Sequence, residues 1–88
     1  MNVEVKTTKP EIEAVVLTLT PRELILLAVS NFRHTDGHIF GIATRETVTA
    51  GLDEAFKAIV GKSVARSVHT MRGQDADVAE AIAVKAGL

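Results

Sequence analysis

The start of the first helix is the sequence feature that most constrains the fold. Residues 20–23 read Thr-Pro-Arg-Glu, which places a capping hydroxyl, a proline at the first helical position and a glutamate three residues after the cap. This capping box is typical of a helix N-terminus, because the two side chains satisfy backbone amides that lack partners within the helix. Leu19 and Leu24 occupy the flanking positions of a hydrophobic staple. The sequence therefore predicts a sharp corner at Thr20 with a helix after it.

The residues before this corner are typical of β-strands. Residues 3–6 alternate valine with charged residues, residues 7–10 have turn chemistry, and residues 11–19 are rich in β-branched side chains. The pattern predicts one strong strand over residues 11–19, or a hairpin that also includes the N-terminal residues. Alternation then assigns the two faces of the second strand. We expect Val15, Leu17 and Leu19 to pack on the core, and Val16, Thr18 and Thr20 to be more exposed.

The remainder of the chain has helical periodicity. Residues 24–29 are apolar on almost every side, so the first helix should be covered on more than one side. From residue 44, apolar side chains recur every three or four positions and the stripe runs through Gly61. A glycine costs about 1 kcal/mol inside a helix, so the pattern leaves open whether residues 44–72 form one helix or two. Asp75 is predicted to cap a final helix whose core contacts are Val78 and Ile82.

Length and composition place these elements in one domain. A chain of 88 residues with 47% hydrophobic and 24% charged residues can build a single core, so residues 1–88 form one domain. No apolar run approaches the roughly 20 residues of a membrane span. There is no cysteine, and the N-terminus lacks the apolar stretch of a signal peptide. We expect a cytoplasmic protein of the α+β class, with an N-terminal strand or β-hairpin followed by three or four helices and no membrane partner.

Two features predict a homodimer. The helix over residues 21–33 has apolar residues at six consecutive positions, more than one strand or hairpin and a few short helices are expected to cover. The β-branched strand over residues 11–19 also has an edge that invites pairing with a second copy. A compact monomer whose C-terminal helices wrap the first helix is the alternative.

Residue types that carry catalysis or bind metal do not gather into a known constellation. His34, Asp36 and His38, together with His69, could supply zinc ligands, but their spacing on a glycine-containing turn favours a polar turn. The Gly-Lys-Ser of residues 61–63 resembles the end of a phosphate loop, yet Phe56 occupies the position where that motif needs glycine. No serine has a nucleophile-elbow motif and no carboxylate pair is evident. We expect no metal, no cofactor and no enzymatic activity.

A basic segment is the candidate functional surface. No acidic residue occurs between Glu54 and Asp75, although the whole chain has a formal charge of −1. On a continuous helix, spacings of four and three would place Lys62, Arg66 and His69 on one face, opposite the apolar Val64, Val68 and Met71. The predicted partner-binding residues are Lys62, Arg66, His69 and Arg72. An ordinary solvated helix surface is the alternative. So few cations imply only a weak, salt-sensitive contact with nucleic acid, so a protein partner is favoured.

Part of the chain resembles a family of small proteins. The run from Val15 to Leu24, the apolar helix after it, and Thr44-Arg45-Glu46 leading into residues 52–56 resemble small accessory proteins of actinobacterial phages. The resemblance covers about half of the chain and departs in the loop over residues 35–43. It implies a small binding protein, directed at a host protein, and it carries no catalytic residues.

The same segment also looks like a ribbon-helix-helix repressor, in which one strand pairs with its twin and the second helix opens with a pair such as Thr44-Arg45. Two features count against this likeness. The loop between the helices is longer than that family's turn, and the strand face of Val16, Thr18 and Thr20 lacks side chains that read bases. The sequence thus favours a non-enzymatic, homodimeric protein-binding module, with a DNA-binding repressor as the alternative.

Overall fold

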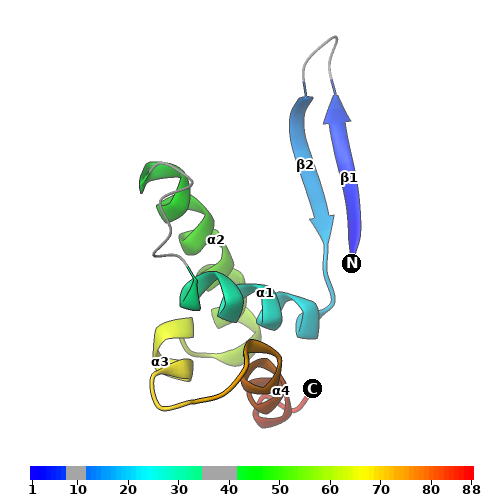
Figure 1. The fold of residues 1–88 in the computed structure, drawn as a ribbon. Coiled ribbons are helices and arrows are strands. Elements are labelled where there is room, and N and C mark those ends of the chain that lie inside the picture. The colour runs from blue at the N-terminus through cyan, green and yellow to red at the C-terminus, as the bar shows by residue number, and fades with distance from the viewer. Residues whose placement is uncertain (8–11, 35–41) are drawn as a thin grey trace.

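The computed structural model describes residues 1–7, 12–34 and 42–88. An antiparallel hairpin of two strands comes first and four helices follow within these ranges, which confirms the α+β class (Figure 1). The strands are β1 (Asn2–Thr7) and β2 (Ile12–Thr18), and the helices are α1 (Pro21–Arg33), α2 (Ile42–Val60), α3 (Val64–Val68) and α4 (Asp75–Lys85). The hairpin, one of the two forms that the sequence allowed, extends away from the helices.

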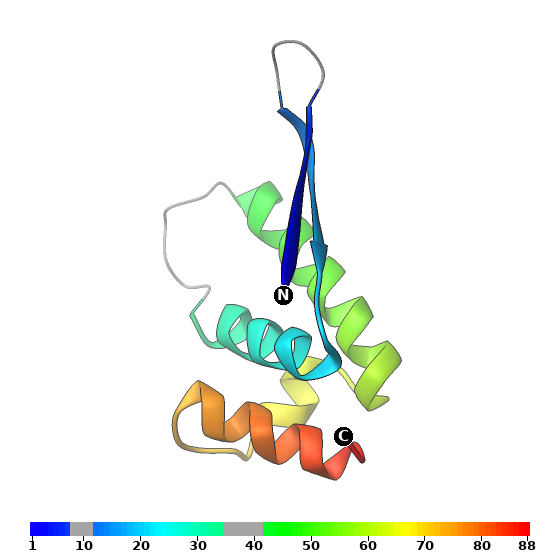
Figure 2. The same cartoon turned by 90° about the vertical axis from the view of Figure 1, so that its right-hand side faces the viewer.

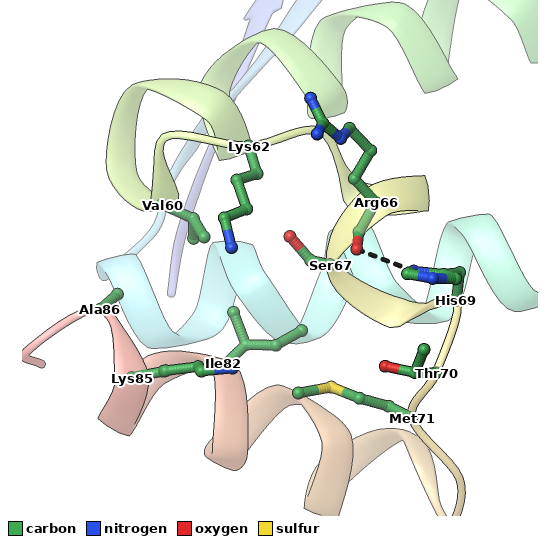
Figure 3. A pocket seen from close by; sticks show the side chains of 10 residues that line it. All are labelled: Val60, Lys62, Arg66, Ser67, His69, Thr70, Met71, Ile82, Lys85 and Ala86. Carbon is green, nitrogen blue, oxygen red and sulfur yellow. Dashed lines mark hydrogen bonds between the residues drawn. The ribbon is translucent and has the colours of Figure 1, made fainter.

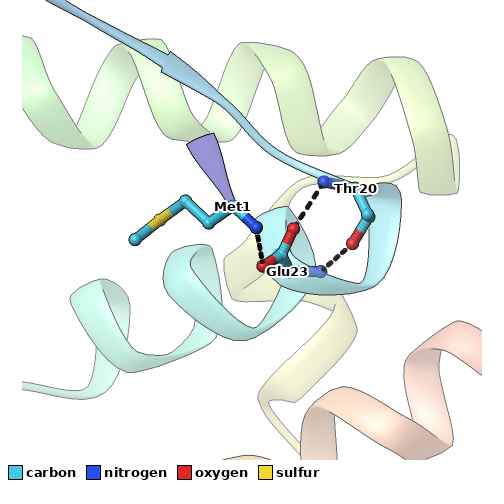
Figure 4. A network of polar contacts seen from close by, with 3 residues as sticks. All are labelled: Met1, Thr20 and Glu23. Atoms are coloured by element: carbon cyan, nitrogen blue, oxygen red, sulfur yellow. Dashed lines mark hydrogen bonds and ion pairs between the residues drawn. The ribbon is translucent and has the colours of Figure 1, made fainter. Parts of the chain in front are cut away.

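The corner between β2 and α1 has the predicted capping box (Figure 4). The Thr20 hydroxyl accepts a hydrogen bond from the Glu23 amide at 3.2 Å, and a Glu23 carboxylate oxygen accepts one from the Thr20 amide at 2.9 Å. The other oxygen of Glu23 lies 2.6 Å from the N-terminal ammonium of Met1. The cap of α1 therefore also holds the start of β1.

The core lies between α1 and the three later helices. Helix α1 packs on α4, α2 and α3, and the buried side chains are Ile25, Ala28, Val29, Phe56, Val64, Val68, Val78, Ala79, Ile82 and Ala83. The predicted core contacts of Val78 and Ile82 are confirmed. Within one chain, however, α1 buries one side only, because Leu26 and Leu27 remain 41% and 37% exposed.

The chain breaks between α2 and α3, which answers the question that the periodicity left open. Gly61 has a φ of +87°, in the left-handed region that favours glycine, and its amide donates to the carbonyl of Lys57 at 2.8 Å. Ser63 then caps α3 by accepting a hydrogen bond from the Arg66 amide. Asp53 of α2 accepts from the Val64 amide at 2.8 Å, which fixes α3 against α2. Residues 42–68 therefore form two helices and not one.

The start of α4 corrects a prediction. Gln74 is the N-cap and Asp75 is the first helical residue, so Asp75 does not cap the helix. Its carboxylate instead accepts a hydrogen bond from the His34 ring at 2.8 Å and pairs with Arg33 at 3.1 Å. Partial burial raises the pKa of Asp75, but hydrogen bonds from His34 and Ser30 and the neighbouring positive charges outweigh it, so the pKa is lowered. The side chain joins the start of α4 to the end of α1.

The hairpin also differs from expectation in its faces. Val15 and Leu17 are 53% and 50% exposed, so the prediction that they pack on the core of the same chain is wrong. The reason is that neither strand packs substantially on a helix in the described part of the chain. Leu19, close to the capped corner, is half-buried. None of the described helices is both long enough and apolar enough to cross a bilayer.

Candidate binding pocket

A pocket of about 340 Å³ opens between the end of α2, α3 and the C-terminal part of α4. The described side chains that line it come from all three regions (Figure 3). They are Val60, Lys62, Arg66, Ser67, His69, Thr70, Met71, Ile82, Lys85 and Ala86. Three of the four predicted partner-binding residues are in this set, and Arg72 is not.

The local fold brings these residues together by a route other than the predicted one. Helix α3 spans only five residues, so Lys62 lies in the bend before it and His69 is its C-cap. The prediction of a single helix face through Lys62, Arg66 and His69 is therefore wrong. The three residues still reach one pocket because the two ends of so short a helix lie close together. The left-handed turn at Gly61 and the Ser63 cap set the position of Lys62.

The floor of the pocket is apolar. Val60, Met71, Ile82 and Ala86 line it, and Ile82 is only 3% exposed. The predicted apolar stripe opposite the basic residues is confirmed for Val64 and Val68, which are buried, while Met71 packs on the core and also lines the pocket. A ligand here would meet hydrocarbon beneath a basic rim.

The rim is basic and hydroxyl-bearing. Figure 3 shows the Lys62 side chain reaching towards α4, where Lys85 lies, while the guanidinium of Arg66 extends away from α4. The Ser67 hydroxyl donates to the Ser63 carbonyl at 2.9 Å, and the His69 Nδ1 lies 3.1 Å from the Arg66 carbonyl oxygen. No carboxylate is present among the described lining residues. Lys62 and Lys85 are therefore the cations best placed to meet an anion over the floor.

Ion pairing separates the pocket cations from the others. Lys6, Arg22, Arg33 and Lys57 each pair with a carboxylate. Within residues 1–6, 15–34 and 46–88, whose side chains are described, the lysines and arginines without an ion pair are Lys62, Arg66, Arg72 and Lys85. Three of these four line the pocket. Positive charge that the fold leaves unneutralised is thus concentrated at one place.

Sequence reasoning missed Lys85, which joins the pocket from a helix that follows the basic segment. The available signal was its position in the last turn of the final helix, where a cation suits the helix dipole. Nothing in linear spacing relates residue 85 to residue 62. Only the packing of both α3 and α4 on α1 does so.

The predicted metal alternative finds no support in the described residues. His34 hydrogen-bonds to Asp75, and His69 lies in the basic pocket. Asp36 and His38 lie outside the described residues. No group of three histidine, aspartate or glutamate side chains that could hold a metal ion occurs in the part that the structure describes.

Comparison of the chain with protein-family profiles, with curated protein sequences and with solved structures gave no significant match. The likeness to phage accessory proteins therefore stays a prediction from the sequence.

Proposed function

We propose that this protein is a non-enzymatic binding module whose basic pocket receives an acidic segment of a partner protein. One observation carries the proposal: Lys62, Arg66 and Lys85 have no carboxylate partner among the described residues, and all three line one pocket with an apolar floor. A segment that combines a carboxylate with an apolar side chain would use both features. The carboxylate would lie between Lys62 and Lys85, and the apolar side chain would cover Ile82 and Met71.

The energetics favour such a mixed ligand. An exposed ion pair contributes only about 0.2–1 kcal/mol, so Lys62 and Lys85 alone would bind a carboxylate weakly. Burying an apolar side chain on the floor adds about 1.5–3 kcal/mol. Charge then selects the ligand, while apolar contact supplies much of the affinity.

The ribbon-helix-helix alternative has less support. In that family one strand pairs with its twin, whereas here β2 pairs with β1 of the same chain. The hairpin face that carries Glu4 and Lys6 pairs these two charges with each other at 3.2 Å, so the described strand side chains form no basic ribbon for a DNA groove. The chain also has only three aromatic residues, all phenylalanine, on which bases could stack.

The sequence supports two further parts of this proposal. The resemblance of residues 15–24 and 44–56 to phage accessory proteins points to a host protein as the partner, and the absence of cysteine suits a cytoplasmic setting. Self-association is a separate proposal whose evidence lies in the hairpin.

The test is binding to an array of short peptides that combine glutamate pairs with leucine or phenylalanine, followed by fluorescence anisotropy on the best binder. Lys62→Glu and Lys85→Glu should each weaken binding about ten-fold, because each removes an attraction and adds a repulsion worth together about 1.4 kcal/mol. Both side chains are exposed, so the fold should remain intact.

Arg72→Glu is the matched control. It makes the same change in net charge at a neighbouring unpaired cation that does not line the pocket. Arg72→Glu should weaken peptide binding by less than about three-fold, since it removes only a screened long-range attraction. Equal losses in all three variants would refute the pocket as the site. Salt-sensitive binding to mixed-sequence duplex DNA, with no peptide bound, would favour the repressor alternative.

A further inference from the structure

The hairpin presents an apolar face to solvent. In its antiparallel register Val3 lies opposite Leu17 and Val5 lies opposite Val15, so these four side chains share one face. Each is between 50% and 53% exposed. The other face carries Glu4 opposite Val16, and the pair of Glu4 with Lys6 keeps its charges there. We call the four-residue set the valine face.

Nothing within the described part of the chain covers the valine face. Neither strand packs substantially on a described helix, and the start of β1 is held to α1 by the ion pair of the Met1 ammonium with Glu23. Figure 2 shows the hairpin extending from the level of α1 out beyond the helices. An isolated two-stranded hairpin is only marginally stable in water, and a hydrophobic face needs a packing partner.

The exposed area is large for a chain of this size. A compact monomer of 9.4 kDa exposes about 5,000 Å², whereas this chain exposes 6498 Å². Its radius of gyration is 14.3 Å, against about 12 Å for a compact domain of the same length. The single chain therefore exposes about 1,500 Å² more than its mass requires.

We propose that a second copy of this chain covers the valine face, in a two-fold symmetric homodimer held together through the hairpins. Obligate homodimer interfaces bury at least about 1,000 Å² on each chain and are more apolar than transient interfaces. The excess of about 1,500 Å² belongs to the whole chain and is larger than one such interface needs, and the valine face is the uncharged part of that surface on which no described helix packs. A two-fold axis brings the same patch of each copy into the contact, so one uncharged face is matched by its own twin.

The proposal is independent of ligand binding at the pocket. The hairpin extends from one end of the molecule, while α3 and α4, which line the pocket, lie at the other end (Figure 1). A dimer formed through the hairpins would leave both pockets open. The two pockets of one dimer would together bind a partner with repeated acidic segments more strongly than a single pocket would.

The test is the mass of the whole protein by sedimentation equilibrium across the micromolar range, with one substitution on each face of β2. The wild type should sediment at about twice 9.4 kDa. Val15→Lys should raise the dimer dissociation constant at least about 30-fold, because a buried interface position is lost. Val16→Lys, at the next residue on the opposite face, should leave the dimer intact.

A second, more conservative pair of substitutions controls for disruption of the hairpin itself. Val15→Thr and Val16→Thr keep the β-branched shape that suits a strand, and Val15→Thr alone should weaken the dimer. A wild-type mass of 9.4 kDa would contradict the proposal and leave the face to a different partner. Two other results would also contradict the proposal, because the contact would then lie elsewhere. One is a dimer that Val15→Lys does not weaken. The other is a dimer that the Val16 variants weaken as much as the Val15 variants do.

Discussion

At the scale of single residues, Glu23 links two parts of the chain. One carboxylate oxygen accepts from the Thr20 amide, and the other lies 2.6 Å from the Met1 ammonium. The hydrogen bond to the ammonium, followed by that to the Thr20 amide, lowers the pKa of Glu23 from 4.5 to about 2. The capping box could be predicted from residues 20–23 alone because its partners are three residues apart. The contact with Met1 could not, because it depends on where the hairpin returns.

The lowered pKa of Glu23 predicts an acid-sensitive contribution to stability. In the unfolded chain this carboxyl takes up a proton at a higher pH than in the folded chain, so the folded state loses stability as the pH falls. The contribution is fully present above pH 4.5 and disappears as the pH falls through about 2. We expect the difference in unfolding free energy between the wild type and Glu23→Gln to shrink over this interval.

Urea unfolding of both proteins at several pH values between 6 and 2 would measure that difference. Asp75, whose pKa is also lowered, contributes equally to both proteins and therefore cancels. A difference that stays constant over the interval would show that Glu23 is not tied to the ammonium and the cap in solution.

At the scale of elements, the bend between α2 and α3 decides where the basic side chains go. Periodicity predicts helix on both sides of Gly61 but cannot locate a break, since the apolar spacing continues through it. The break depends on Gly61 adopting a φ of +87° and on Asp53 holding the first amide of α3. Lys62 lies in this bend, so its direction towards α4 follows from the turn and not from a helix face.

The same substitution at two glycines should therefore have opposite effects. Gly61→Ala should destabilise the fold by about 1–2 kcal/mol, because a side chain disfavours a left-handed backbone even though no atom lies within 4 Å of the added methyl. Gly51→Ala lies inside α2, is equally free of clashes and should stabilise by up to about 1 kcal/mol. Thermal unfolding of both variants measures the pair. If both substitutions changed the melting temperature in the same direction, residues 60–63 would not form the turn described above.

For the hairpin, the sequence predicts which side chains share a face but not what that face packs against. Alternation correctly placed Val15 and Leu17 on one face, because side-chain direction in a strand has period two. It could not say what that face packs against. The core of this chain is built where α2, α3 and α4 pack on α1, and neither strand packs substantially on a described helix, so the face stays exposed.

At the scale of the whole molecule, two surfaces of different chemistry lie at opposite ends. The hairpin offers an uncharged apolar face, and the α3–α4 end offers unpaired cations around an apolar floor. The sequence predicted the basic surface in outline, from a segment without acidic residues, but it placed the apolar excess on the helix over residues 21–33 and on the strand edge, and not on the hairpin face. It assigned Arg72 to the basic surface and missed Lys85, because the packing of α4 is set by contacts distant in sequence.

The central claim is that the pocket between α3 and α4 binds acidic segments, separately from any contact of the hairpin. Nuclear magnetic resonance of the ¹⁵N-labelled protein, titrated with the best-binding glutamate peptide, tests it most directly. The account predicts that amide shifts concentrate in the segments 60–71 and 82–86, which contain the residues that line the pocket, while those of residues 2–7 and 12–18 stay unchanged. Shifts centred on the hairpin, or none at saturating peptide, would contradict it.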